Sequence, residues 1–296
     1  MAYIFVHIGL PKTATTTIQK DILEKLPEEN KLKYFGVKHP RKASQEKLFR
    51  EFYCFISTGD NLGSIKEMIH EVLESGNDVI ISEEMITVST EKSWREKTYF
   101  LSLLLENFNY KIIVSVREPE KAMFSYYIEL FEKYNKVNNE FLPVAMKEES
   151  MEIFHYKKLF EHLHSIFDRN KISVIRFEDL ITGNHLVILK VLSVPYKDFN
   201  GTLKDNNTRQ KNKNFIIINK ETNLVYLLQN LIPPFLRPII NALKDLRVFK
   251  FLGRKLNMKF SKTYKINIPP ESHFLILGEF LEEDKKYLRE NYGIKY

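Results

Sequence analysis

Short apolar runs alternate with amphipathic segments of helical period through the first 200 residues of the chain. The runs are continuous and rich in β-branched and aromatic residues, as is typical of strands that are buried on both faces of a sheet. Strands joined by helices pair in parallel, so this alternation predicts a three-layer α/β fold with a central parallel sheet flanked by helices. The predicted strands are YIFVHI (3–8), DVIIS (78–82), KIIVSV (111–116) and KISVIRF (171–177).

The last third of the chain has a different character. Residues 224–256 are apolar and basic and are interrupted by three prolines, whereas 273–293 follow the pattern of one final helix. No flexible linker precedes this third. We therefore expect a single domain over 1–296, with an α/β core in 1–200 and a mostly helical extension or lid in 201–296.

The chain holds one cysteine, Cys54, so it can form neither an intrachain disulfide nor a cysteine-based metal site. We expect Cys54 to be a small buried side chain in a reducing compartment. The N-terminus has no basic region, and no run approaches the ~18 apolar residues of a transmembrane segment. These features predict a soluble, cytoplasmic protein.

The net charge of the chain is +7. This excess of basic residues favours anionic ligands, among them nucleotides, acidic glycans, nucleic acids and lipid headgroups. Charge does not select among these classes, so the choice depends on local motifs.

A loop suited to phosphate follows the first predicted strand directly. A turn between a parallel strand and a helix directs backbone N–H groups and the positive end of the helix dipole at an anion. Pro11 stands where the common ATP-binding loop has a glycine before its lysine. Threonine-rich helix starts are also ordinary N-caps, but a lysine between the turn and the cap favours a ligand site of the P-loop type. The loop is GLPKTATTT (9–17), with Lys12 as a point charge and the hydroxyls of Thr13, Thr15, Thr16 and Thr17 as donors.

A second motif, SVREPEKAMFSYY (115–127), places Arg117 at the end of a strand and Ser125 on the helix that Pro119 begins. Both side chains can converge on one anion, to which arginine offers a fork of donors. Alone, the motif is as well explained by a surface arginine and a helix-facing serine. Beside the loop, it predicts a nucleotide with two separate anionic ends.

Together the two motifs resemble those of sulfotransferases that use 3′-phosphoadenosine 5′-phosphosulfate (PAPS). HIGLPKTATTTIQ (7–19) looks like the 5′-phosphosulfate loop of the family, and VREPEKAMFSYY (116–127) looks like its 3′-phosphate motif. The resemblance covers almost the whole chain and is greatest to bacterial enzymes of the carbohydrate sulfotransferase type. Its weaker parts are YFGV (34–37), VIISEEM (79–85), the stretch 154–180 and LEEDKKYLRENYG (281–293).

The resemblance implies in-line transfer of a sulfuryl group from PAPS to a hydroxyl of a carbohydrate or glycan, leaving PAP. Electrostatic stabilisation would dominate, with Lys12 at the leaving bridging oxygen. Arg117 and Ser125 would hold the 3′-phosphate, and no metal is required. The 5′-phosphosulfate would lie against Pro11, Lys12, Thr13, Ala14, Thr15, Thr16 and Thr17.

Three further positions bear on this resemblance. Ala14 stands where the family usually has glycine, and alanine fits without strain only if that residue is already helical. Glu118 follows the arginine where an uncharged residue is frequent, so we expect its side chain to point away from the phosphate. The late basic stretch 206–213 contributes Arg209 and Lys211 as candidates for closing over the 3′-phosphate, although a solvated loop is the alternative.

The acceptor hydroxyl needs a base, and Glu83 is our prediction because it follows a strand end at the sheet edge where α/β folds bind ligands. The alternative explanation of Glu83 is an acid at a helix start. Glu84 and His7 are the competing bases, and His7 suits a core or supporting role better. Trp94 could stack on adenine or a sugar, or it could be a core residue.

Two other functions remain open. A P-loop kinase or NTPase would need ATP and magnesium, and the acids after residue 82 fit it. A basic nucleic-acid-binding protein would need basic residues interleaved with exposed aromatics, which the sequence does not offer. We expect no nucleic-acid partner, and a carbohydrate or glycan acceptor that is either acidic or lipid-linked. The mixed apolar and basic stretch near 232–251 fits peripheral membrane contact, and an amphipathic packing helix is the favoured alternative. The oligomeric state stays open.

Overall fold

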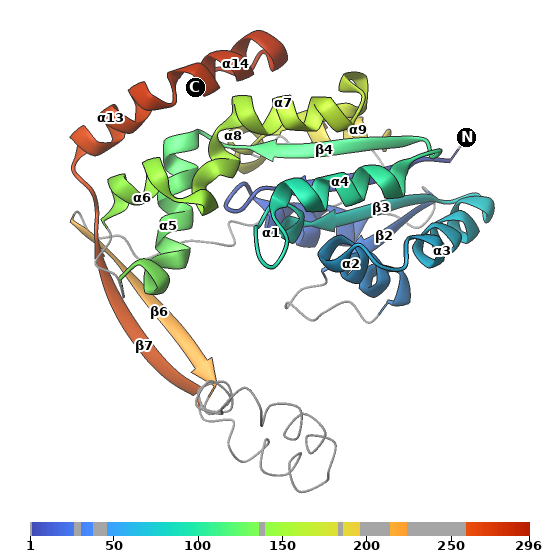
Figure 1. Ribbon diagram of the computed structural model, residues 1–296, viewed down its shortest axis with the longest axis horizontal. Helices are drawn as coiled ribbons and strands as arrows, with labels where there is room; N and C mark the ends of the chain where they lie inside the picture. The colour runs from blue at the N-terminus through green and yellow to red at the C-terminus, as the bar shows by residue number, and fades with distance from the viewer. Residues whose placement is uncertain are drawn as a thin grey trace, which may run out of the picture. The chain divides into compact units, whose positions relative to one another are not determined.

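The centre of the computed structural model is a parallel sheet of five strands in the order β2-β3-β1-β4-β5, lying among helices (Figure 1). The structure describes residues 2–26, 31–37, 46–135, 140–182, 186–195, 214–223 and 259–296. The predicted fold class, a central parallel sheet flanked by helices, is confirmed. The strands are β1 (Ile4–Gly9), β2 (Leu32–Gly36), β3 (Asp78–Glu83), β4 (Tyr110–Val116) and β5 (Ile172–Arg176).

Four of these strands lie where the apolar runs predict them, with each end within one residue of the prediction. β1 is central and buried along its whole length, which explains why its sequence is apolar at nearly every position. β2 was not predicted, because it is an edge strand and only its last residue, Gly36, is buried.

Helices cover the sheet on its two faces. On one face, Phe5 of β1 and Ile80 of β3 belong to one buried cluster with Ile18, Ile22 and Leu189. Alternate residues of the strands point to the other face. The helical segments of this part are α1 (Thr15–Thr17), η1 (Ile18–Ile22), η2 (Leu23–Lys25), α2 (Lys47–Thr58), α3 (Leu62–Glu74), η4 (Glu84–Ile86), α4 (Trp94–Leu105), α5 (Pro119–Asn135), α6 (Phe141–Lys147), η5 (Glu149–Phe154), α7 (Tyr156–Ile166), η6 (Arg169–Lys171), α8 (Phe177–Ile181) and α9 (Leu186–Val191).

The chain divides into two compact units, Met1–Asn206 with Pro270–Tyr296, and Asn207–Pro269. The described part of the second unit is an antiparallel ribbon of β6 (Phe215–Asn223) and β7 (Lys259–Asn267). Neither strand was predicted in the extension, which we expected to be mostly helical. The apolar and basic stretch 224–256 lies outside the described residues.

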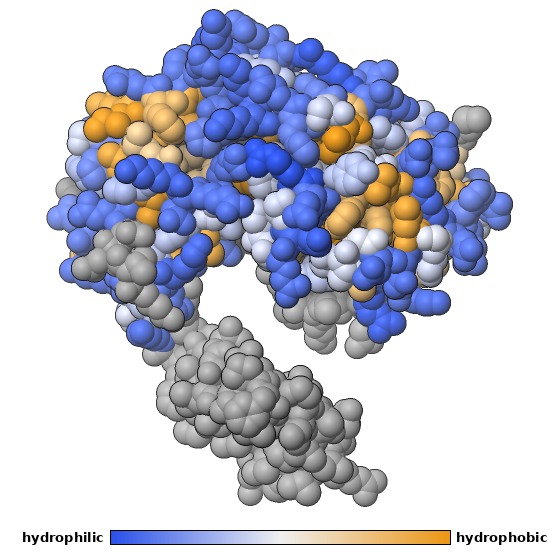
Figure 2. Space-filling view, in the orientation of Figure 1, coloured by the Kyte–Doolittle hydropathy of each residue, from blue (hydrophilic) through white to orange (hydrophobic). Residues whose placement is uncertain are grey.

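The end of the chain forms two helices, α13 (Glu271–Phe280) and α14 (Glu282–Tyr292), where one helix was predicted. The break lies at Leu281, whose backbone leaves helical geometry (φ −100°, ψ 11°). α13 exposes Leu275, Ile276 and Phe280, and Figure 2 shows apolar side chains gathered where this helix lies. No helix in the described ranges is long and apolar enough to span a membrane.

The expectation that Cys54 is buried is wrong. Cys54 lies on α2 and is exposed. α2 buries one stripe of its surface, made of Leu48, Phe49, Phe52, Phe55 and Ile56, and Cys54 falls outside that stripe.

Candidate active site

The loop that follows β1 depends on glycine at its first position. A side-chain carbon on Gly9 would lie 2.4 Å from the hydroxyl oxygen of Thr15. Real contacts of this kind are longer, so any larger residue would push Thr15, and with it the start of α1, away from the strand. Gly9 therefore lets the chain fold back tightly at the carboxyl edge of the sheet.

Two residues of the loop adopt the left-handed conformation, Lys12 (φ 66°) and Ala14 (φ 69°, ψ 21°). Ala14 is thus not helical, and the condition under which alanine fits without strain is not met. The left-handed region costs a non-glycine residue about 1–2 kcal/mol. Turns of this kind can direct backbone N–H groups into an anion-binding concavity.

The threonine hydroxyls of the loop divide into two groups. Thr13 and Thr15 are buried, and both donate to the carbonyl oxygen of Leu10, at 2.7 Å and 3.3 Å. Their protons therefore hold the loop in shape. Thr16 and Thr17, at the end of the loop in α1, are half-buried.

A chain of buried hydrogen bonds connects the loop to the strands of the sheet. It joins β3, β1 and β4, because His7 pairs in register with Ser82 and Gly9 with Ser115. Its bonds are Gln19 Nε2 to Ser82 Oγ (3.2 Å), Ser82 Oγ to His7 Nδ1 (2.8 Å), His7 Nε2 to Ser115 Oγ (3.4 Å), and Ser115 Oγ to Thr13 Oγ1 (2.7 Å).

Only one arrangement of protons satisfies this chain. The Thr13 proton goes to Leu10, so Ser115 must donate to Thr13 and accept from His7 Nε2. His7 Nδ1 is then the acceptor for Ser82. Burial lowers the pKa of His7 to about 3, so the ring is neutral at physiological pH. His7 is 0% exposed and lies within the core, as the sequence favoured.

Arg117 is held from three directions at the end of β4. Its Nη1 donates to the carbonyl oxygen of Lys12 at 3.2 Å, and its guanidinium lies 4.4 Å from the ring centre of Phe177. The hydroxyl of Tyr156 donates to the Arg117 carbonyl oxygen at 2.6 Å and accepts from its N–H at 3.2 Å. The structure thus brings the two sequence motifs together. The sequence analysis did not single out Tyr156 or Phe177.

Helix α5 carries the remaining residues of the second motif. Pro119 begins the helix, as predicted, and Ser125 is half-buried on it. Glu118 forms an ion pair with Lys121 at 2.5 Å, so its charge is engaged locally. One turn after Ser125, the carboxylate of Glu129 lies 2.5 Å from the ammonium of Lys12. The sequence motifs do not indicate this contact.

The predicted base, Glu83, ends β3 and is 3% exposed. Its Oε1 accepts from the N–H of Met85 at 2.8 Å, which is the helix-start role that the sequence left as the alternative. Glu84 is half-buried at the start of η4. The segment after η4 contacts the start of the loop, because the Thr87 hydroxyl donates to the carbonyl oxygen of Gly9 at 3.1 Å.

A buried lysine fixes the segment after β3. Lys97 of α4 is 2% exposed, and its ammonium donates to the Met85 and Val88 carbonyl oxygens, at 3.1 Å and 2.7 Å, and to Thr90 Oγ1 at 2.9 Å. Burial lowers the pKa of Lys97, and the charge of Glu83 raises it in opposition. A lysine within a helix pattern gives no sequence signal for this role.

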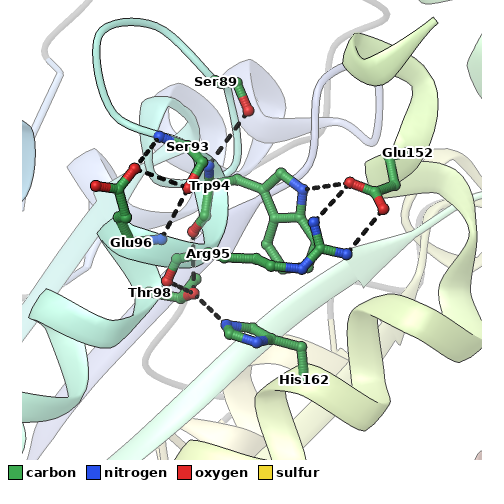
Figure 3. Close-up of polar contacts among 8 residues, drawn as sticks. All are labelled: Ser89, Ser93, Trp94, Arg95, Glu96, Thr98, Glu152 and His162. Atoms are coloured by element: carbon green, nitrogen blue, oxygen red, sulfur yellow. Dashed lines mark hydrogen bonds and ion pairs between the residues drawn. The ribbon is translucent and has the colours of Figure 1, made fainter.

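Trp94 belongs to a cluster of polar contacts at the start of α4, drawn in Figure 3 and called here the supporting cluster. Its residues are Ser89, Ser93, Trp94, Arg95, Glu96, Thr98, Glu152 and His162. Its indole N–H and the guanidinium of Arg95 both donate to the carboxylate of Glu152, while His162 lies edge-on to the indole ring. Ser93 and Glu96 cap the helix reciprocally. Trp94 is 1% exposed and is therefore a core residue that cannot stack on a ligand.

Arg209 and Lys211 lie outside the described residues. Within the described ranges, no group of three or more histidine, cysteine or acidic side chains is arranged to hold a metal ion.

Comparison with known proteins gives structural likeness alone. No family model and no curated sequence matches the chain. A sulfotransferase from Alicyclobacillus acidocaldarius is similar over 83% of this chain and 98% of its own, with a TM-score of 0.44 and 14% identity. The sulfotransferase domains of the Synechococcus PCC 7002 olefin synthase and of the curacin biosynthetic pathway each have a TM-score of 0.39, cover 70% of this chain and 81% of theirs, and are 13% and 15% identical. Likenesses at this level leave the activity to be argued from the chain's own residues.

Proposed function

We propose that the chain is a PAPS-dependent sulfotransferase that moves a sulfuryl group to a hydroxyl of a carbohydrate or glycan and releases PAP. The observation that carries the proposal is the hydrogen bond between Arg117 and the Lys12 carbonyl oxygen, at 3.2 Å. It joins two motifs that each resemble one end of a PAPS site. Both lie at the carboxyl edge of the sheet on neighbouring strands, where α/β folds bind ligands.

The residues of the loop fit an anionic group. Gly9 allows the tight return of the chain, and the left-handed residues Lys12 and Ala14 shape a turn suited to phosphate or sulfate. Thr16 and Thr17 would add hydroxyl donors, and Arg117 with Ser125 would bind the 3′-phosphate. PAPS would supply the sulfuryl group and a phosphate leaving group.

Lys12 would act during transfer by balancing the charge that grows on the bridging oxygen. Preorganised donors of this kind contribute roughly 10²–10³ in rate. Lys12 is 25% exposed at its side chain, so it reaches solvent while its backbone is held by Arg117. The acceptor proton needs a carboxylate, for which Glu83 remains the sequence-based prediction.

Calorimetric titration tests the proposal directly. PAP should bind without magnesium, whereas ATP should bind weakly or need the metal. Binding of ATP with magnesium and none of PAP would overturn the proposal in favour of a kinase or NTPase, the second candidate, which the position of Glu83 beside Ile8 of β1 favours. Transfer from labelled PAPS to a panel of glycans then identifies the acceptor.

Substitution of the lysine tests the mechanism. Lys12→Ala should abolish transfer, and Lys20→Ala is the matched control because Lys20 is an exposed lysine of the following η1. Normal turnover by the Lys12 variant would remove Lys12 from the mechanism.

A further inference from the structure

The carboxylate of Glu129 reaches the one lysine of the loop. Its Oε2 lies 2.5 Å from Lys12 Nζ, and the two side chains are 46% and 25% exposed. Glu129 is four residues after Ser125 on α5, so the two side chains lie on the same face of that helix. A carboxylate and the serine of the second motif are therefore presented together toward the loop.

Fold stability does not account for this contact. Ion pairs between partly exposed side chains contribute about 0–1 kcal/mol, and the loop already has the Arg117 bond and the buried chain below it. What distinguishes the ion pair between Glu129 and Lys12 from other surface ion pairs is that it involves the proposed catalytic lysine.

The candidate bases near this edge, Glu83, His7 and Glu129, differ in their access to an acceptor. Glu83 is buried and caps Met85, and His7 is buried with both ring nitrogens hydrogen-bonded. Either would have to break buried bonds to meet a hydroxyl. Glu129 is the most exposed of the three. Burial raises the pKa of Tyr126 on the same helix, and the charges of Glu129, Tyr134 and Glu84 add to this.

We infer that Glu129 is the general base of the transfer, an inference that rests on the proposed function. Glu129 takes the proton of the acceptor hydroxyl as the hydroxyl oxygen bonds to sulfur. The bond between sulfur and the phosphate oxygen breaks with its electron pair on that oxygen, and Lys12 balances the resulting charge. The proton ends on the Glu129 carboxylate and passes to water.

In the free protein, the ion pair between Glu129 and Lys12 should also oppose nucleotide binding, although Glu129 promotes catalysis. Before the nucleotide binds, Glu129 holds the ammonium that the nucleotide needs, and its charge repels an anionic ligand. Removing the carboxylate should strengthen nucleotide binding and weaken catalysis. A residue that only supports the fold would weaken both.

The experiment compares Glu129→Gln with wild type, and with Glu132→Gln as a control that removes the same charge from the same helix. PAP affinity is measured by calorimetry, and turnover as PAP release from PAPS with water or a panel of hexoses as the hydroxyl donor. For Glu129→Gln we expect PAP affinity about two- to fivefold higher and turnover lower by about 10²–10⁴. Glu129→Asp should recover part of the rate.

Two results overturn the inference. One is wild-type turnover by Glu129→Gln, and the other is a loss of PAP affinity in parallel with turnover. Glu83→Gln and Glu84→Gln are measured beside it, and a larger loss in either assigns the base there. If wild-type protein binds no PAP, the proposed function itself fails, which is a separate outcome.

Discussion

Arg117 Nη1 donates to the backbone carbonyl oxygen of Lys12 at 3.2 Å, joining the end of β4 to the loop after β1. Arg117 therefore holds the backbone of the loop in place even without a ligand. Its stacking on Phe177 and the two bonds between its backbone and Tyr156 leave it little freedom. A ligand would meet a guanidinium that is already oriented, which reduces the entropy lost on binding.

Arg117→Ala should lower PAP affinity by about 10- to 100-fold, because charge-assisted hydrogen bonds contribute about 1.5–3 kcal/mol. Arg117→Lys should not restore it, since lysine cannot stack on Phe177 and offer a fork of donors together. Calorimetry with PAP measures both. Arg95→Ala is the control, because Arg95 pairs with Glu152 in the supporting cluster. Unchanged PAP affinity in Arg117→Ala would contradict the assignment.

Ala14→Gly should stabilise the protein. Left-handed alanine costs about 1–2 kcal/mol, whereas glycine adds about 0.5–1 kcal/mol of unfolded-state entropy, so a net gain of up to about 1.5 kcal/mol is expected. Urea denaturation measures the midpoint. Ala145→Gly, within the regular helix α6, should show the opposite sign. A destabilised Ala14→Gly protein would show that the left-handed conformation carries no strain.

Gly9→Ala should destabilise the protein by about 1–3 kcal/mol, because the added carbon meets the Thr15 hydroxyl at 2.4 Å. The double variant Gly9→Ala, Thr15→Ala removes the obstructing atoms and should recover part of the loss. A double-mutant cycle in urea isolates the coupling between the two positions. Strict additivity would mean that the loop adjusts without pressing on Thr15.

The buried His7 should make stability depend on pH. Its folded pKa of about 3 lies below the unfolded value near 6.5, so its contribution is complete above pH 6.5 and is lost as pH falls toward 3. Within that window the unfolded chain binds one more proton, which gives about 1.4 kcal/mol of unfolding free energy per pH unit. Comparing wild type with His7→Gln in urea at several pH values isolates this slope from other acids. Equal slopes in the two proteins would show that His7 titrates normally.

Lys97→Met should cost about 2–4 kcal/mol, because the part-buried Met85 and Val88 carbonyl oxygens lose the charged donor that they share. PAP affinity should also fall, since Thr87 of the same segment donates to Gly9 at the start of the loop. Lys92→Met is the matched control, because Lys92 pairs with Glu96 at the surface. Wild-type stability in the Lys97 variant would contradict the proposed anchoring role.

The sequence predicts the sheet well because burial on both faces demands continuous apolar runs, as β1, β3 and β4 show. The ribbon escaped prediction because β6 pairs with a strand that follows dozens of residues later, and local patterns carry no trace of that pairing. At the site, residue types predicted the loop and Arg117. The left-handed backbone of Ala14 and the contact of Glu129 with Lys12 depend on tertiary packing, which single-sequence patterns do not encode.

The pairing of β6 with β7 bears on how the connection between these two strands can change in length. The N–H of Ile268 donates to the carbonyl oxygen of Asn214 at 3.0 Å, so the backbone departs and returns at adjacent points. A gain or loss of residues between the two strands need not move either point, and the loop-closure cost of added length grows only slowly. The number of residues between β6 and β7 can therefore change without shifting the two points at which the ribbon begins and ends.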